Sequence, residues 1–474
     1  MRGIATPRAP RTVGPLSELR RNCISLLDNF GQTMGVLSPA GTISVIIPLL
    51  ILSAGNGTWL LLLVTLAIFL VVMLAVLRFA ALHSSAGSLA AFSRLGFGAR
   101  GGLIAAWIYL LGIGFCIPAA LLTAAAYIDL LLVPWFGAPA GALRISAITA
   151  LLTLGCWGAA FYGVKFSTHL MLLIECVSVT LMTVLVLAGM FHSHAWVDLP
   201  QLHLTGLRFS GLQGGLVLAF MLMAGFEGAT SLGEESKDAT AAIPTAIASC
   251  MLPLTAVYLL MTYCIVSLEN RGVVAGEVDG LTVPFDNIAH ALGVPWLGAL
   301  SSVGVAMSYF ACALGSLTVA ARVLYSMARD GQFFPAFAAV HASNATPALS
   351  IGLIGLISML LPVGVLVAGG SVSFGITFIS QLGSIGLIGG YLAVVLALPI
   401  YLRRLGLLET RDLVTSSLAG AMLLLVLVLS VYPVPAPPYV YVVYVFGVST
   451  LAGIALSTLS MAQRSRAQES GEFS

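Results

Sequence analysis

Residues 60–77 read LLLLVTLAIFLVVMLAVL and decide the fold class, because this apolar run contains no charged side chain. As an α-helix, a run of this length is about as long as the hydrocarbon core of a bilayer is thick. Strands of a membrane β-barrel instead alternate apolar and polar residues. We therefore expect a membrane-spanning α-helix at these positions.

The composition of the whole chain agrees with this interpretation. Of its 474 residues, 59% are hydrophobic and only 8% are charged, whereas soluble domains carry roughly 25% charged residues. So few charges cannot cover a soluble surface, and they also exclude a disordered or nucleic-acid-binding protein. The composition predicts an all-α integral membrane protein that crosses the bilayer many times.

Similar apolar runs recur along the chain and predict twelve spans. With the N-terminus in the cytoplasm, only Arg144, Arg208 and Arg271 of the 20 basic residues fall outside. This asymmetry predicts a multi-pass protein of the plasma, or inner, membrane with both termini cytoplasmic. Residues 1–27 lack the apolar core of a signal peptide, so this tail and residues 462–474 are expected in the cytoplasm. The expected spans are 28–52, 59–81, 101–132, 145–163, 168–191, 212–233, 243–267, 297–326, 348–368, 373–401, 413–432 and 438–461.

Two of these spans are interrupted by helix-breaking residues. The first contains Ser38-Pro39-Ala40-Gly41-Thr42, where Pro39 removes a backbone donor and Gly41 allows close approach to the backbone. The sixth contains Gly225-Phe226-Glu227-Gly228, in which a carboxylate that is costly in lipid stands near two glycines. We expect both helices to be discontinuous, since unwound backbone at this depth must line a cavity or pack against protein. An ordinary proline kink and a hydrogen-bonded structural glutamate are the alternatives.

The spacing of the two breaks predicts an internal repeat. Positions 41 and 225 are 184 residues apart, and the spans that hold them begin at 28 and 212, again 184 apart. Two halves of five spans each, 28–191 and 212–401, would then enter the membrane from opposite sides. Interrupted helices at matching positions of inverted repeats mark the binding sites of secondary transporters. The last two spans, within 413–461, fall outside the repeat.

Two broken helices also predict the kind of ligand. An unwound helix exposes amide groups at the positive end of the segment that follows, so Ala40, Gly41 and Thr42 are expected to hold a carboxylate. The half-helix that ends near Ala224 exposes carbonyl oxygens at its negative end, and these can hold an ammonium group. A site that offers both kinds of group fits an α-amino acid.

Several segments carry a resemblance to a known family. Gly225-Phe226-Glu227-Gly228 is followed by Gly233-Glu234-Glu235-Ser236-Lys237-Asp238 and Ile243-Pro244-Thr245-Ala246-Ile247, and residues 320–331 read AARVLYSMARDG. In these segments and in its span order, the chain resembles the amino acid–polyamine–organocation permeases. The resemblance implies a five-plus-five inverted-repeat fold, alternating access and amino acid substrates. The first span departs from the family, because Ser-Pro-Ala-Gly-Thr replaces the usual G-[SA]-G.

The resemblance also implies roles for individual residues. Phe220 or Phe226 is expected to gate the site, and Glu227 to act in pH-dependent gating. Glu175 lies where some proton-coupled relatives carry a lysine, and it is a candidate for binding the coupled proton; a hydrogen-bonded packing role is the alternative. The residues expected to bind the substrate are Ala40, Gly41, Thr42, Tyr109, Phe220, Met221, Leu222, Ala224 and Gly225.

These observations predict a secondary active amino acid transporter that works as a proton-coupled symporter, with exchange or polyamine transport as alternatives. A channel would need rings of carbonyls or charges along a pore, and an enzyme would need clustered catalytic groups; the sequence has neither pattern. No metal or cofactor is expected, since His192 and His194 lack further ligands nearby. The expected partners are the amino acid, a coupling ion (H⁺) and the lipid bilayer. Apolar residues around Met221 favour neutral or apolar substrates over cationic ones.

Overall fold

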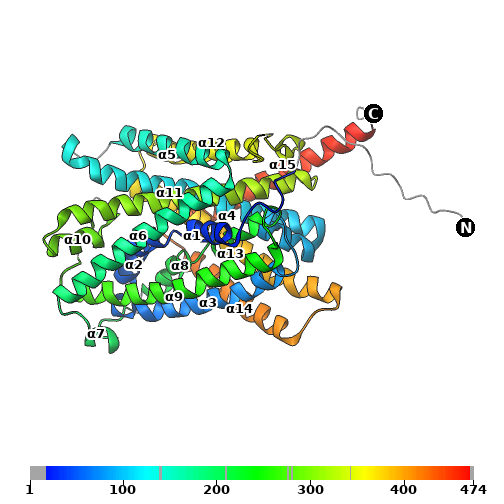
Figure 1. Cartoon of the computed structure of the whole chain (residues 1–474). Helices are drawn as coiled ribbons and strands as arrows, with labels where there is room; N and C mark the ends of the chain where they lie inside the picture. Colours follow the sequence, from blue (N-terminus) through cyan, green and yellow to red (C-terminus); the bar gives the residue numbers. More distant parts are fainter. Residues whose placement is uncertain are drawn as a thin grey trace, which may run out of the picture.

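The computed structural model describes residues 18–137, 141–208, 211–274, 277–278, 281–341 and 343–469, so the predicted tails lie partly outside it. The described chain is a bundle of long α-helices that lie roughly side by side, with short helices and a two-stranded hairpin between them (Figure 1). The elements are α1 (Leu26–Leu37), α2 (Pro39–Ala54), η1 (Gly55–Gly57), α3 (Thr58–Ala80), α4 (Ser88–Phe136), α5 (Ala142–Tyr162), α6 (Val164–His192), α7 (Leu199–Leu202), α8 (Leu212–Phe220), η3 (Phe226–Leu232), α9 (Ala239–Asn270), β1 (Glu277–Val278), β2 (Leu281–Thr282), α10 (Pro284–Ala291), α11 (Pro295–Arg329), η4 (Pro335–Ala338), α12 (Ala348–Val367), α13 (Val372–Leu405), α14 (Thr410–Val431) and α15 (Tyr441–Glu469).

Each apolar run that the sequence marks as a span falls on one long helix or on consecutive shorter ones. Among the described residues, ten helical segments are long and apolar enough to cross a membrane. One of these segments, Leu26–Ala80, holds α1, α2 and α3 together, whereas α8 and η3 are each shorter than a span. The last helix continues to Glu469, past the predicted end of the last span at 461.

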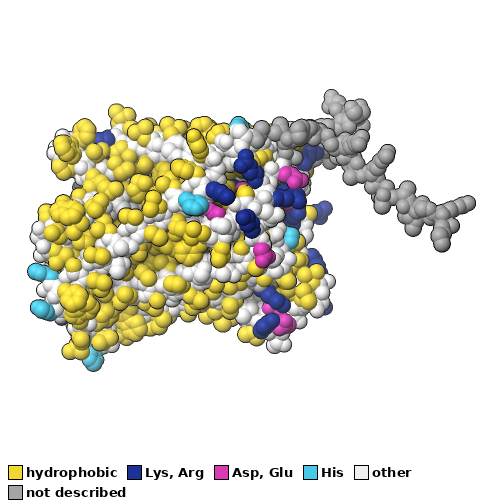
Figure 2. Space-filling model, viewed as in Figure 1, with side chains coloured by type: hydrophobic (Ala, Val, Ile, Leu, Met, Phe, Trp, Pro, Cys, Tyr) yellow, Lys and Arg dark blue, Asp and Glu magenta, His cyan; other side chains and the backbone are white. Residues whose placement is uncertain are grey.

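The surface of the bundle is apolar along its sides and basic at one end. Lysine and arginine side chains gather at the right of Figure 2, whereas hydrophobic side chains cover most of the remaining face. Large hydrophobic side chains are exposed on helices along the whole chain, for example Leu63 of α3 and Leu459 of α15. An apolar belt of this kind is what a helix bundle presents to lipid. The chain is therefore a multi-pass membrane protein, as the sequence predicts.

Local sequence signals explain where α1 begins and how the bundle centre packs. Ser25 and Asp28 form a capping box, in which each side chain accepts a hydrogen bond from the other residue's N–H group. The helices α4 and α13 pack closely through glycines: a Cβ atom added to Gly112 would lie 2.5 Å from the carbonyl carbon of Gly386. Small residues of this kind let membrane helices approach each other.

Candidate functional site

The first predicted span is two helices rather than one. Ser38 has a left-handed backbone (φ 48°), which ends α1 at Leu37, and Pro39 begins α2. Proline suits this first helical position because its missing N–H group would have no helical partner there. Gly41 lies close to Tyr309 of α11, since a Cβ atom added to Gly41 would lie 2.9 Å from the Tyr309 Cε2 atom. The break is thus built by the Ser-Pro-Ala-Gly sequence and is packed against α11.

The sixth predicted span is interrupted in the same way. The helix α8 ends at Phe220, the next residues form turns, and Gly225 (φ 95°) precedes the 3₁₀ helix η3. Only glycine adopts such a backbone readily. A Cβ atom on Gly225 would lie 2.3 Å from Val36 Cγ1, and one on Gly228 would lie 2.9 Å from Val36 Cγ2. Val36 is in the last turn of α1, so the two breaks contact each other.

The amide groups of the first break are already bonded to other helices. The Ala40 amide donates to Glu175 Oε2 of α6 (3.2 Å), and the Gly41 amide donates to Ser308 Oγ of α11 (2.9 Å). Ser308 Oγ lies 2.6 Å from Glu175 Oε1 and donates to it, and it lies 2.8 Å from Ser38 Oγ. Glu175 is fully buried, and it forms no ion pair with any described residue. In this structure the carboxylate at the start of α2 is therefore the side chain of Glu175, at the place where the sequence predicts the carboxylate of a substrate.

The second break leaves backbone groups without partners. Within the described part of the chain, the carbonyl oxygens of Met221, Leu222 and Ala224 accept no hydrogen bond, and the amides of Met223 and Ala224 donate none. Buried backbone groups are almost always paired, with water or a ligand where protein is missing. These groups lie at the carbonyl end of α8, where the helix dipole favours a cation.

A cavity of about 440 Å³ lies where the breaks meet α4, α11 and α13. Its lining on α1–α2 runs from Val36 to Leu49, and on α8 and the following turns from Gly214 to Ala224. The cavity therefore extends from the breaks toward the end of the bundle that is opposite the start of α1. No charged side chain is among the described residues that line it.

The cavity separates the predicted substrate-binding residues into two groups. Thr42, Met221 and Ala224 line it. The others lie behind or beside this lining: Ala40, Gly41, Tyr109, Phe220, Leu222 and Gly225. Sequence reasoning missed lining residues on α1, α2 and α8, such as Val36 and Val217, and all of those on α4, α11 and α13, among them Ile113, Cys116, Tyr309, Cys312, Thr377, Ser380, Gln381 and Ser384. The signal that could have found the last four is their spacing, which places polar residues on one face of an otherwise apolar helix.

Glu227 lies in a buried hydrogen-bond network rather than in the cavity lining. Tyr109 donates to its Oε1 atom (2.8 Å), and Tyr391 of α13 donates to its Oε2 atom. The Gly225 amide donates to the Tyr391 hydroxyl (2.7 Å), so this network also holds the turn before η3. Ser88 extends it, since its hydroxyl lies 3.2 Å from the Tyr109 hydroxyl. The glutamate is thus satisfied without lipid contact, as burial of a charged group requires.

The two candidate gating aromatics belong to a cluster around Tyr391. The Phe226 ring stacks on Tyr391 with centroids 5.3 Å apart, and the Phe220 ring lies 4.7 Å from Phe69. All four rings are fully buried. The cluster therefore packs α3 and α13 against the second break, and Tyr391 connects it to Glu227.

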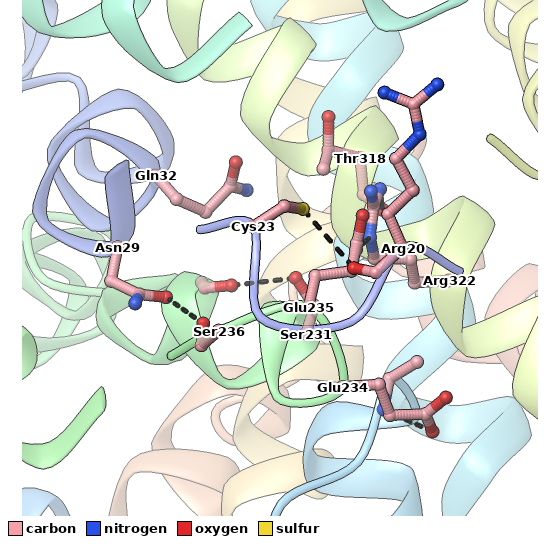
Figure 3. Close-up of polar contacts among 12 residues, drawn as sticks. Arg20, Cys23, Asn29, Gln32, Ser231, Glu234, Glu235, Ser236, Thr318 and Arg322 are labelled. Atoms are coloured by element: carbon pink, nitrogen blue, oxygen red, sulfur yellow. Dashed lines mark hydrogen bonds and ion pairs between the residues drawn. The ribbon is translucent and has the colours of Figure 1, made fainter. Parts of the chain in front are cut away.

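At the basic end of the bundle, the chain before α1 covers the space between the helices. Figure 3 shows the segment with Cys23 passing between α1, which carries Asn29 and Gln32, and α11, which carries Thr318 and Arg322. The amides of Cys23 and Ile24 both donate to the Glu235 carbonyl oxygen (2.8 and 2.9 Å). This backbone pairing fixes the segment to the chain that follows η3.

Two ion pairs reinforce this end. Arg322 Nε donates to Glu235 Oε2 (2.7 Å), and both side chains are buried. Arg329 donates two hydrogen bonds of 2.6 Å to Glu234, which also accepts the Ala86 amide (3.1 Å). Burial alone would raise the pKa of Glu234, but the hydrogen bonds from Arg329 and Ala86 outweigh it and hold the pKa below its usual value. The basic end is therefore closed by paired charges, in contrast to the cavity at the other end.

Comparisons with known proteins agree with this architecture. A family model described as "Amino acid permease" matches residues 29–432. The chain is similar to an uncharacterized transporter of Mycobacterium tuberculosis (25% identical over 342 residues, 72% of this chain and 73% of that protein). It is also similar to the branched-chain amino acid permease of Bacillus subtilis (26% over 254 residues, 53% and 51%) and to the mouse cationic amino acid transporter 4 (30% over 156 residues, 32% and 23%). With a family match that covers most of its length, broken helices and a cavity between them, the chain belongs to the amino acid permease family.

Proposed function

We propose that this protein is a secondary transporter that carries neutral α-amino acids across the membrane by alternating access. The observation that carries the proposal is the position of the cavity at the meeting point of the two broken helices. Met221 and Ala224 line the cavity at the negative end of α8, and their carbonyl oxygens, which accept no hydrogen bond from a described residue, suit the ammonium group of an amino acid. Discontinuous helices of this kind form the binding sites of secondary transporters.

We propose twelve crossings, arranged as two inverted halves (28–191 and 212–401) and two further helices within 413–461. Besides the ten segments long enough to cross, Leu26–Ala80 holds a second crossing, and α8 with η3 supplies the twelfth. The basic end is assigned to the cytoplasm by the positive-inside rule, in a plasma or inner membrane. On this assignment the cavity belongs to the outer side and the paired charges close the inner side, which is the outward-facing state.

The coupling ion that we propose is the proton, with Glu175 as its site. The Glu175 carboxylate holds the Ala40 amide and the Ser308 hydroxyl. The Gly41 amide donates to the same Ser308 hydroxyl, so Glu175 is linked to this amide through Ser308. A protonated Glu175 is a weaker acceptor, so its protonation frees these donors for the carboxylate of the substrate. Proton and amino acid then bind together, which is the requirement for symport. Glu227 is proposed to act in gating, because its two tyrosine donors join α4 and α13 across the second break.

The absence of charge in the described cavity lining supports a neutral substrate. A cationic side chain or a polyamine needs a fixed anion to compensate its desolvation, and the two buried glutamates of the membrane region point at other helices. The relatives include one named for branched-chain and others for cationic amino acids. The uncharged lining favours the neutral class for this chain.

The test is uptake into liposomes that hold the purified protein, with each of the 20 amino acids and putrescine offered as competitors of radiolabelled alanine. Competition by neutral amino acids is expected, and a pH gradient (acidic outside) should drive accumulation. Met221→Trp fills the cavity and should abolish uptake, whereas Leu425→Trp changes a lipid-exposed position of α14 and should retain it. Absence of uptake and exchange for every amino acid would overturn the proposal.

A further inference from the structure

One face of α13 presents a row of four polar side chains to the cavity. Thr377, Ser380, Gln381 and Ser384 all line it, and their spacing of three and four residues places them on one side of the helix. We call this set the α13 stripe. The rest of the helix is largely apolar, so the stripe is a local exception to the composition of a membrane span.

The side chains of the α13 stripe make no hydrogen bond with any described group. Hydroxyl groups elsewhere in the bundle commonly donate to their own helix, as Thr123 does to the Ala119 carbonyl (2.8 Å) and Thr318 to the Leu314 carbonyl (2.9 Å). Ser384 is 5% exposed, and its Oγ atom is fully buried without a partner. Such groups need water or a ligand as partner, so the α13 stripe has capacity to bind a polar group that enters the cavity.

Another part of the cavity lining has the opposite character. The helices α2 and α8 pack against each other and contribute only apolar side chains beyond Thr42, namely Val45, Ile46, Leu49, Val217 and Leu218. The helix α13 packs instead against α4. A substrate held at the breaks by its amino and carboxylate groups can therefore place its side chain against both an apolar and a polar part of the lining.

We propose that the α13 stripe selects neutral amino acids whose side chains carry a carboxamide or hydroxyl group, with Gln381 as the main specificity-determining residue. The Gln381 amide offers both a donor and an acceptor, which is the complement of a carboxamide. The stem of the substrate side chain packs on the apolar wall, and its polar end pairs with the stripe. An aliphatic side chain leaves the stripe unpaired and binds less well. This inference rests on the proposed function, since it names the substrate class of the same site.

The experiment measures how well glutamine and leucine each inhibit uptake of radiolabelled alanine into proteoliposomes. The melting temperature of each purified variant shows whether it is folded. The wild-type protein should be inhibited more strongly by glutamine than by leucine. Gln381→Met keeps the length of the side chain and removes its hydrogen bonds, so it should lower the glutamine preference about tenfold.

A matched control is available in α8. Gln213 of α8 bonds to the Tyr432 carbonyl and does not line the cavity, so Gln213→Met should leave the preference unchanged. A wild-type preference for leucine, or an unchanged preference in Gln381→Met while alanine uptake continues, overturns the inference and leaves the proposed function standing. Absence of all amino acid uptake overturns both.

Discussion

Replacement of Glu175 by glutamine tests whether this carboxylate couples the proton to the substrate. The two side chains have nearly the same shape, but glutamine carries no charge and does not titrate. In the structure, Glu175 accepts the Ala40 amide at 3.2 Å and the Ser308 hydroxyl at 2.6 Å, at a buried position. Glutamine can still bond to both groups, since Ser308 can also accept. The variant should therefore fold and keep the break between α1 and α2.

The expected magnitude follows from the strength of these two bonds. A hydrogen bond to a charged group contributes about 1.5–3 kcal/mol and one between neutral groups about 0.5–1.5 kcal/mol. The loss of charge therefore weakens each bond by about 1 kcal/mol, and both by up to about 2 kcal/mol. If the substrate carboxylate competes with Glu175 for the same donors, its affinity rises by this amount, about 5- to 30-fold. In the wild type, affinity should rise as the pH falls, whereas in Glu175→Gln it should not change with pH.

The assay is concentrative uptake into proteoliposomes under an inward proton gradient. One coupled proton and a gradient of one pH unit supply about 1.4 kcal/mol, enough for about tenfold accumulation. Glu175→Gln should exchange internal for external substrate but should not accumulate it. The control is Glu269→Gln at the far end of α9, a carboxylate remote from the breaks, which should accumulate normally. Wild-type accumulation by Glu175→Gln would show that the proton is carried elsewhere.

Three further predictions concern the second break and the basic end. Gly225→Ala should lower the thermal stability and reduce uptake severely, because its backbone has φ 95° and the new Cβ atom would meet Val36 at 2.3 Å; unaltered melting and uptake would contradict the geometry. Glu227→Gln should cost about 1–3 kcal/mol in the free energy of unfolding, because its hydrogen bonds with Tyr109 and Tyr391 lose their charge assistance, and it should flatten the pH dependence of uptake if Glu227 gates. Because the pKa of Glu234 is lowered in the fold, its pairing with Arg329 stabilises the protein above the usual glutamate pKa of about 4.3, and this stabilisation is lost as the pH falls through the lower folded pKa. The pair is partly exposed and contributes about 0.5–1 kcal/mol. Between pH 7 and 3, the melting temperature of Glu234→Gln should therefore fall less steeply than that of the wild type.

The positions of the helices and of both breaks could be predicted from the sequence because each has a strong local cause. Apolar runs of about 20 residues have one stable form in lipid. Pro39 next to Ser38, and Gly225 two residues before a carboxylate, favour a break at each place, although other prolines, such as Pro48 and Pro253, remain inside helices. These signals act within a few residues, so they are visible without any knowledge of the packing.

The identity of the groups facing the cavity could not be predicted, because it depends on which helices meet. The amide groups of Ala40 and Gly41 were expected to be free for a substrate, but their partners are 135 and 267 positions away along the chain. The same holds for Glu227, whose two tyrosine partners come from α4 and α13. Of the predicted residues at the breaks, Thr42, Met221 and Ala224 line the cavity, whereas Gly41 and Gly225 pack against Tyr309 and Val36.

The groups that close the basic end also suggest why a transporter of this form can change state. Arg322 Nη2 and Gln32 Oε1 are buried there without a hydrogen-bond partner among the described residues. Unpaired buried groups are costly, and water entering at this end would satisfy them. Against this stand the Arg322–Glu235 pair and the backbone bonds from Cys23 and Ile24 to Glu235. On the alternating-access mechanism proposed above, movement of the second broken helix would strain these bonds, because Glu235 lies close after the end of η3 at Leu232. Substrate binding at one end of that helix would then be linked to closure at the other.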